Sequence, residues 1–144
     1  AEGWALYAEL LAHELGWYAD DPYGNLGRLQ AEAFRAARLV VDTGIHTKGW
    51  TFEKAEQFFT GNTGFERDDS VNPQYEIARY SVWPGQSTAY KIGMFKILEL
   101  RQKAQDELGD RFDLKEFHSL LLKNGSMPLE VLEGVVNEYI NAHQ

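Results

Sequence analysis

The stretch that decides the fold is STAYKIGMFKILELRQKAQDEL, residues 87–108. Its apolar side chains recur at intervals of three or four residues, the spacing of one face of an α-helix. These side chains are Tyr90, Met94, Ile97, Leu98, Ala104 and Leu108. Gly109 follows directly, and glycine is the residue that most often ends a helix. The pattern predicts a long amphipathic helix from Ser87 to Leu108.

A second long helix is expected from Leu26 to Ile45. Its predicted apolar stripe runs through Leu26, Leu29, Ala33, Ala37, Val40, Val41 and Ile45. The basic side chains of this segment fall elsewhere on the cylinder, at Arg28, Arg35 and Arg38. We expect the two long helices to pack side by side.

Shorter helical patterns fill the rest of the chain. We expect helices over Glu2–Tyr18, Thr51–Phe59, Gln74–Tyr80, from a cap at Asp113 to Leu122, and from Pro128 to about Ala142. No alternating strand pattern is present, so the prediction is an all-α fold of five to seven helices, with residues 1–144 forming one domain. The helical pattern begins in the first turn, at Ala1. We therefore expect the sequence to start inside a longer chain, with a processed N-terminus as the alternative.

The composition excludes several classes of function. The 22 acidic and 14 basic residues give a formal net charge of −8, which argues against a nucleic-acid surface. The sequence has no cysteine, so disulfides and thiolate zinc sites are excluded, while the cellular compartment stays open. No apolar run approaches the roughly 20 residues that a membrane span needs.

Two pairs of polar residues are spaced four apart on expected helices. Glu9 and His13 can share a metal ion, although two ligands are too few for a zinc site, and a solvated ion pair is the alternative. Asp42 and His46 can form a carboxylate–imidazole pair of the kind found at catalytic histidines. A structural histidine is the alternative there.

A third polar cluster surrounds the Pro84-Gly85 break between two helices. It combines two phenols, a guanidinium, an ammonium and an amide, from Arg79, Tyr80, Gln86, Tyr90 and Lys91. Donors of this kind can hold a developing oxyanion or a peptide carboxylate. Aromatic packing at a tight helix junction is the alternative, and it explains Trp83 well.

Several of these motifs occur in a recognisable order. They are Glu2-Gly-Trp-Ala with Glu9, Arg38-Leu-Val-Val-Asp-Thr-Gly-Ile-His46, Arg79-Tyr80, Pro84-Gly-Gln86, Ala89-Tyr-Lys-Ile-Gly93, Leu108-Gly-Asp-Arg-Phe-Asp113 and Phe117-His118. Together they resemble the C-terminal portion of the bacterial family called domain of unknown function 885. The resemblance covers essentially the whole chain.

The resemblance implies a zinc metallopeptidase of the gluzincin kind, with a larger, mostly helical zincin-like fold. Such enzymes combine a His-Glu-x-x-His helix with a downstream Glu as the third protein ligand of zinc. Glu2 matches that ligand. The sequence contains no His-Glu-x-x-His, and His13-Glu14-Leu-Gly-Trp17 only mimics its start. We therefore expect zinc as the cofactor of the intact protein, with weak binding or none by these 144 residues alone.

The same resemblance suggests roles for the polar clusters. His46, Tyr80 and Tyr90 are candidate catalytic residues that donate to the oxyanion, and Arg79, Gln86 and Lys91 are candidate substrate-binding residues. Asp42 is expected to orient His46, and Glu9 is expected to lie next to the metal ligand without binding the metal itself. The implied partners are a peptide substrate and the remaining N-terminal part of the same protein. Two alternatives stay open, namely a family member without hydrolytic activity that binds or scaffolds, and a plain helical interaction module.

Overall fold

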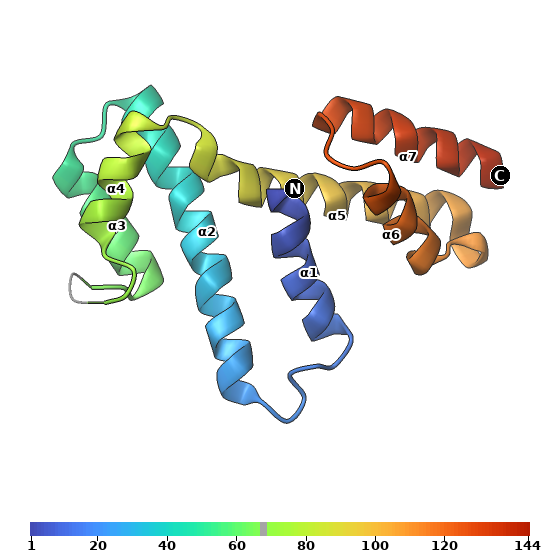
Figure 1. The fold of residues 1–144 in the computed structure, drawn as a ribbon, viewed down its shortest axis with the longest axis horizontal. Coiled ribbons are helices and arrows are strands. Elements are labelled where there is room, and N and C mark those ends of the chain that lie inside the picture. The colour runs from blue at the N-terminus through green and yellow to red at the C-terminus, as the bar shows by residue number, and fades with distance from the viewer. Residues whose placement is uncertain (67–68) are drawn as a thin grey trace.

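The computed structural model describes residues 1–66 and 69–144 (Figure 1). The helices are α1 (Glu2–Glu14), α2 (Pro22–Lys48), α3 (Phe52–Thr63), α4 (Pro73–Val82), α5 (Ala89–Leu108), α6 (Leu114–Lys123) and α7 (Leu129–His143). Two short 3-10 helices, η1 (Gln86–Thr88) and η2 (Gly109–Arg111), flank α5. The described residues contain no strand, which confirms the predicted all-α fold and the number of helices. None of the described helices is both long and apolar enough to cross a bilayer.

The ends of the helices follow the local chemistry of the chain. Gly109 ends α5 with a φ of 55°, as predicted. The first helix is shorter than predicted, because the chain turns at Gly16 with a φ of 79°. The second helix is longer and starts at Pro22, because the side chain of Asp21 accepts a hydrogen bond from the backbone N–H of Gly24.

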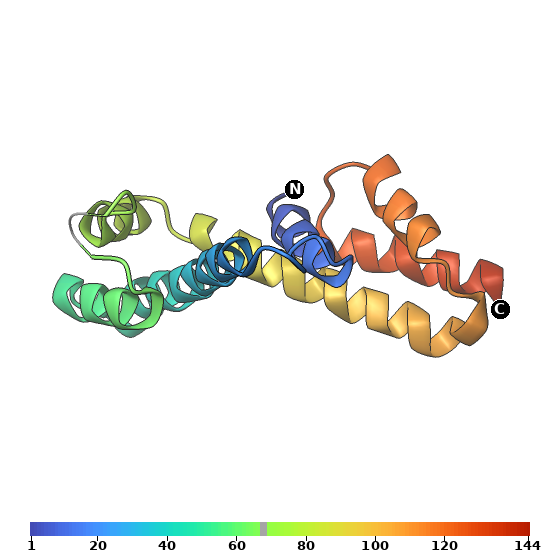
Figure 2. The ribbon, with the colours of Figure 1, turned by 90° about the horizontal axis from the view of Figure 1, so that it is seen from below.

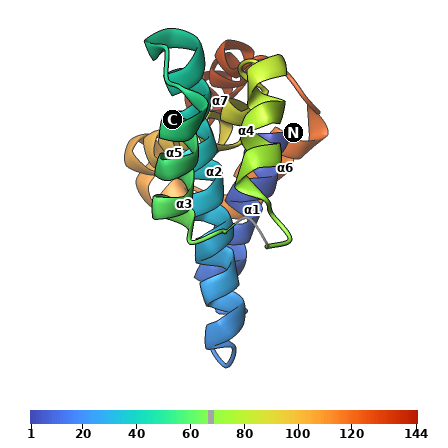
Figure 3. The same ribbon diagram turned by 90° about the vertical axis from the view of Figure 1, so that its left-hand side faces the viewer.

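The helices form two lobes, each with its own core (Figure 1). In the first lobe, α3 and α4 pack against the C-terminal half of α2, as Figure 3 shows from the side. Its core consists of Phe34, Ala37, Val41, Ala55, Phe59, Ile77 and Tyr80. In the second lobe, α1 and α7 pack against α5, and α6 packs against α7. Its core includes Leu6, Tyr7, Leu100, Phe117 and Val136.

The main helix contact of the second lobe is the crossing of α1 over α5 (Figure 2). The two backbones touch at Gly3 and Gly93, where a Cβ added to Gly3 would lie 2.4 Å from the backbone of Gly93. The prediction that the helices around 26–45 and 87–108 pack side by side is therefore wrong. The second helix diverges from α5 and meets it only at the junction of the lobes (Figure 1). Small residues allow the α1–α5 approach, and sequence periodicity carries no mark of it.

The buried face of α2 also differs from the predicted stripe. Leu26, Leu29 and Val40 are exposed. Arg28, Arg38 and Asp42 are buried instead, beside Phe34, Ala37 and Val41. The reason for the burial of Arg38 and Asp42 is that α2 packs against α3, α4 and η1, and Ser87 of η1 donates to Asp42 and to the backbone oxygen of Arg38. The helix thus buries charged side chains and leaves part of its predicted apolar stripe exposed to solvent.

The contact between α1 and α5 predicts a large effect of one methyl group. Gly3→Ala should lower the free energy of unfolding by about 1–3 kcal/mol, because the new Cβ meets backbone that can only yield by separating the helices. Gly134→Ala is the matched control, since a Cβ at this position in α7 meets nothing within 4 Å. It should be neutral or stabilising by about 0.5–1 kcal/mol through helix propensity. Urea unfolding measures both, and equal midpoints for the two variants would contradict the crossing.

Candidate functional site

The junction of the two lobes is held by the carboxylate of Asp42. Both of its oxygens lie 3.0 Å from the backbone N–H of Gly85, and Oδ2 lies 2.6 Å from the hydroxyl of Ser87. Gly85 has a φ of 82°, a conformation that glycine adopts without strain. The carboxylate therefore fixes the Pro84-Gly85 turn and η1 onto α2. The expected support of His46 by Asp42 is replaced by these two contacts.

A buried guanidinium lies beside this turn. Arg38 is 3% exposed, and its Nη2 donates to the side-chain oxygen of Gln86 over 3.1 Å. Its guanidinium carbon lies 5.0 Å from the ring centroid of Tyr90 and 5.4 Å from that of Tyr80. Its Nε is buried and has no hydrogen-bond partner. Arg38 is the centre of the cluster, although the site predicted from the sequence did not include it.

The predicted residues His46 and Tyr80 lie next to each other. The Nε2 of His46 is 2.9 Å from the backbone oxygen of Tyr80. The imidazole is exposed, whereas the Tyr80 side chain is buried in the core of the first lobe. The Tyr80 hydroxyl donates to Glu76 over 2.5 Å. Burial and the hydrogen bond to this carboxylate raise the pKa of the Tyr80 phenol well above its usual value, so it stays protonated.

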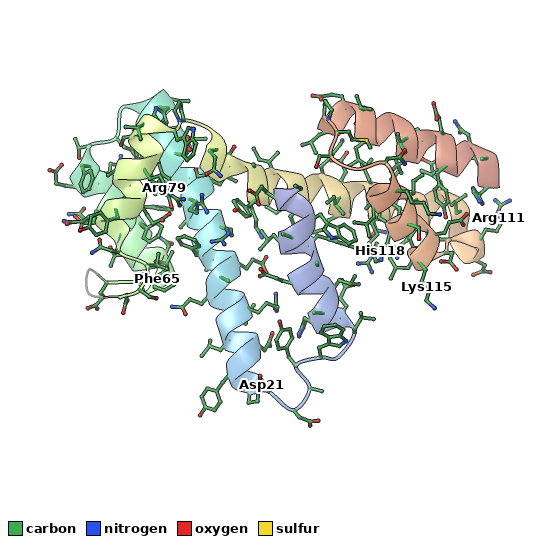
Figure 4. All side chains as sticks on the ribbon, viewed as in Figure 1. Asp21, Phe65, Arg79, Arg111, Lys115 and His118 are labelled. Atoms are coloured by element: carbon green, nitrogen blue, oxygen red, sulfur yellow. The ribbon has the colours of Figure 1, made fainter. Side chains whose placement is uncertain are left out.

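Two of the predicted substrate-binding cations already have carboxylate partners. Arg79, which Figure 4 labels on α4, pairs with Glu76 at 2.5 Å and is exposed. Lys91 is buried and pairs with Glu32 at 2.6 Å. The hydrogen bond from Lys91, with Arg28 nearby, lowers the pKa of the Glu32 carboxyl. The Lys91–Glu32 pair ties α5 to α2, whereas the Arg79–Glu76 pair lies within α4.

Glu2 is one of the residues that line an apolar cavity of about 420 Å³ between α1, α5 and the α6–α7 connection. The lining includes Trp4, Ile92, Ile97, Leu121, Met127 and Leu132. The contact of Gly3 with Gly93 fixes the first turn of α1 there. A cavity of this volume, mostly apolar and with one charged group, has the character of a ligand site.

The other acidic and imidazole groups of α1 do not extend this site into a metal centre. Glu9 and His13 form no hydrogen bond or ion pair with each other in the described structure, and the His13 ring lies 6.5 Å from that of Tyr18. Within residues 1–66 and 69–144, no three His, Asp or Glu side chains come together in a way that could hold a metal ion. Glu2 alone could contribute one ligand.

The structure therefore brings together part of the predicted set. Gln86 and Tyr90 meet at Arg38, and His46 meets the backbone of Tyr80. Glu2 lies apart from them, near Gly93, one turn beyond Tyr90 on α5. Sequence reasoning missed Arg35, Arg38 and Ser87. Two arginines on a face with Phe34 and Val41 were the available signal, because charge on an apolar face is unusual.

A separate polar network links α1 to α5 and α6 in the second lobe. Arg101 donates to the Tyr7 hydroxyl over 3.2 Å, and that hydroxyl lies 2.8 Å from Nε2 of His118. Figure 4 shows His118 on the side of α6 that faces α1. Arg101 also pairs with Glu14 at 2.7 Å. The Tyr7 hydroxyl accepts from Arg101 and can donate its own proton to Nε2 of His118 when that nitrogen carries no proton.

Comparison with known proteins identifies relatives of the whole chain. The sequence model of a family described as bacterial protein of unknown function (DUF885) matches residues 1–136. The crystal structure of a protein described as the putative lipoprotein from Colwellia psychrerythraea is similar with a TM-score of 0.92 and 54% sequence identity, over 98% of this chain. The chain spans only 24% of that protein. No curated protein matches the sequence.

The Tyr7–His118 hydrogen bond predicts a pH dependence of stability. Burial, with the charge of Arg101, lowers the pKa of His118 in the folded protein. Below the ordinary histidine pKa of about 6.5 the unfolded chain therefore takes up a proton that the folded chain resists. The free energy of unfolding of wild type should exceed that of His118→Gln by the largest amount above pH 7. This difference should shrink as the pH falls from about 6.5 toward the lowered pKa of His118. Urea unfolding at several pH values measures it, and a constant difference would contradict the network.

Proposed function

The chain belongs to the DUF885 family of bacterial proteins, and on that premise we propose that it forms part of a zinc-dependent peptidase. In this proposal Glu2 supplies one carboxylate ligand to zinc, and the junction of the lobes binds the peptide. The observation that carries the proposal is the position of Glu2. It lines an apolar cavity, on a first turn fixed by backbone contact with α5. The Glu2 carboxylate would therefore already be in position before a metal ion binds.

The described residues do not fit a complete zinc site. Glu2 is one oxygen ligand, and catalytic zinc sites in proteins use three protein ligands. The other ligands would come from the part of a longer chain that these 144 residues do not include, in line with the 24% share of the Colwellia protein. When bound, zinc would act as a Lewis acid on a substrate carbonyl.

The contacts favour some of the candidate residues over others. His46 is exposed and Tyr90 is half-buried, so both can approach a ligand. Tyr80 is a protonated donor, but its hydroxyl is engaged with Glu76 and would have to be released. Arg79 and Lys91 are held by carboxylates, whereas Gln86 keeps its amide N–H groups available. We therefore assign the role of oxyanion donor first to His46, and the role of substrate binding to Gln86 and Tyr90.

A second candidate function is peptide binding without hydrolysis. The observation that favours it is the absence of a three-ligand group within the described residues. In that case the cavity beside Glu2 and the junction of the lobes would hold a ligand without a metal. Metal analysis of the full-length protein separates the two functions.

Removing the Glu2 carboxylate should remove the metal from the full-length protein. Glu2→Ala should lower zinc content from about one equivalent to near zero, because one lost ligand typically costs metal affinity severely. Inductively coupled plasma mass spectrometry on purified protein measures this. The matched control is Glu53→Ala, which removes an exposed glutamate from the first turn of α3 and should keep the zinc. A zinc-free wild type, or full zinc in Glu2→Ala, would overturn the assignment.

Removing an oxyanion donor should slow turnover without loss of metal. His46→Ala should lower kcat by about 10²-fold at unchanged zinc content, as loss of one such donor does in other hydrolases. Tyr80→Phe should have a similar effect if its phenol leaves Glu76 for the substrate. His143→Ala is a close control, because His143 also bonds the backbone oxygen of a tyrosine, at 2.8 Å. Near-normal kcat in both His46→Ala and Tyr80→Phe would mean that these residues are structural.

A further inference from the structure

The basic side chains of this acidic protein are unevenly paired. Among the described Lys and Arg residues that are buried or half-buried, five form ion pairs with carboxylates, namely Arg28, Lys91, Lys96, Arg101 and Lys103. Arg35 and Arg38 form no ion pair within the described structure. Carboxylates outnumber basic groups in the chain by 22 to 14. Two unpaired guanidinium groups at one place are therefore a specific feature and not a shortage of acids.

The two guanidinium groups share the same pair of aromatic rings. Arg35 lies 4.6 Å from the ring centroid of Phe34 and 4.7 Å from that of Tyr90. Arg38 lies 5.4 Å and 5.0 Å from the same two rings. Cation–π contacts stabilise each group but neutralise neither charge. A buried cation without a counter-charge is costly, and Arg38 has in addition an unpartnered Nε.

The nearby carboxylates are engaged elsewhere. Asp42, one helical turn after Arg38, accepts from Gly85 and Ser87. Glu76 accepts from Arg79 and Tyr80. What remains around the two arginines is a set of donors, from both guanidinium groups and the Gln86 amide. Within the described residues the side-chain oxygen of Gln86 is a neutral acceptor for Arg38, and no carboxylate pairs with either guanidinium. Donors that converge on a half-buried aromatic cluster in this way make an anion receptor.

We propose that Arg35, Arg38 and Gln86 bind the carboxylate of a ligand, and that this is the free C-terminal carboxylate of a peptide. A planar carboxylate fits the guanidinium fork, and the flanking rings offer apolar walls for the last side chain. The net charge of −8 disfavours dianions and polyanions more strongly than a single carboxylate.

The place of the receptor in the fold agrees with this ligand. Tyr90 precedes Gly93 by three residues on α5, a rise of about 4.5 Å. Gly3 packs on Gly93 and the two arginines pack on Tyr90, so the first turn of α1 and the two guanidinium groups lie beside adjacent turns of α5. A short peptide can reach from one to the other. Identifying the anion as a peptide terminus rests on the proposed function, whereas the carboxylate site itself does not.

The test compares two probes that differ only in charge at the C-terminus. N-acetyl-Phe-Leu with a free carboxylate and the same dipeptide as the C-terminal amide are titrated by calorimetry into full-length protein, with chelator present so that no hydrolysis occurs. The acid should bind at least about tenfold more tightly than the amide. In Arg35→Gln this preference should fall to within about twofold, because the acid should lose more affinity than the amide. Arg111→Gln removes a remote, exposed arginine (Figure 4) and should keep the preference.

Several results would overturn the proposal. They are equal binding of acid and amide by wild type, a preference for the acid that survives in Arg35→Gln, and binding of inorganic phosphate without binding of the acid. Arg35 is only half-buried, so its variant decides the question even where Arg38→Gln fails to fold. The readout needs neither zinc nor turnover. A protein that lacks zinc but prefers the acid would therefore refute the proposed peptidase and leave the carboxylate site standing.

Discussion

The contact between Gly3 and Gly93 sets the distance between α1 and α5, and the rest of the second lobe is arranged around it. Neither residue has a side chain, so the backbones can touch. This close crossing brings Tyr7 to within hydrogen-bond distance of His118 on α6, 111 residues later in the sequence. It also leaves the first turn of α1 at the rim of the cavity that Glu2 helps to line. A wider crossing would lose the network and displace the carboxylate together.

The second helix shows how the partners of an element decide which face it buries. Its apolar residues Leu26, Leu29 and Val40 are exposed, while Arg38 and Asp42 are buried against η1. Burying charge is tolerated because Asp42 has two strong donors and Arg28 has Glu32. The exposed apolar side chains are scattered along the opposite side of a long helix. A prediction from the positions of apolar residues alone would have placed the buried face on that side.

The helical content could be read from the sequence, since residues 87–108 repeat their apolar positions over many turns and Gly109 marks the end. The packing could not. A glycine leaves no periodic signal, so nothing in the sequence indicates that Gly3 lies on Gly93. Spacing suggested His46 as the partner of Asp42, four residues away. The actual partners, Gly85 and Ser87, lie 43 and 45 residues further on, and only the folded chain brings them close. Gln86 and Tyr90 were predicted as polar site residues, but Arg38, which contacts both, was predicted only to lie away from the apolar stripe of its helix.

The junction of the lobes and the anion receptor have a common origin in Asp42. Arg38 and Asp42 lie one turn apart on the same helix, where an arginine and an aspartate would ordinarily neutralise each other. The turn at Gly85 presents a backbone N–H, and Ser87 a hydroxyl, to the carboxylate instead. That closes the connection between α4 and α5 onto α2. It also leaves Arg38 with a single neutral acceptor, Gln86, in an aromatic environment. The bond that joins the two lobes is thus the reason that a buried guanidinium is free for an anion from outside.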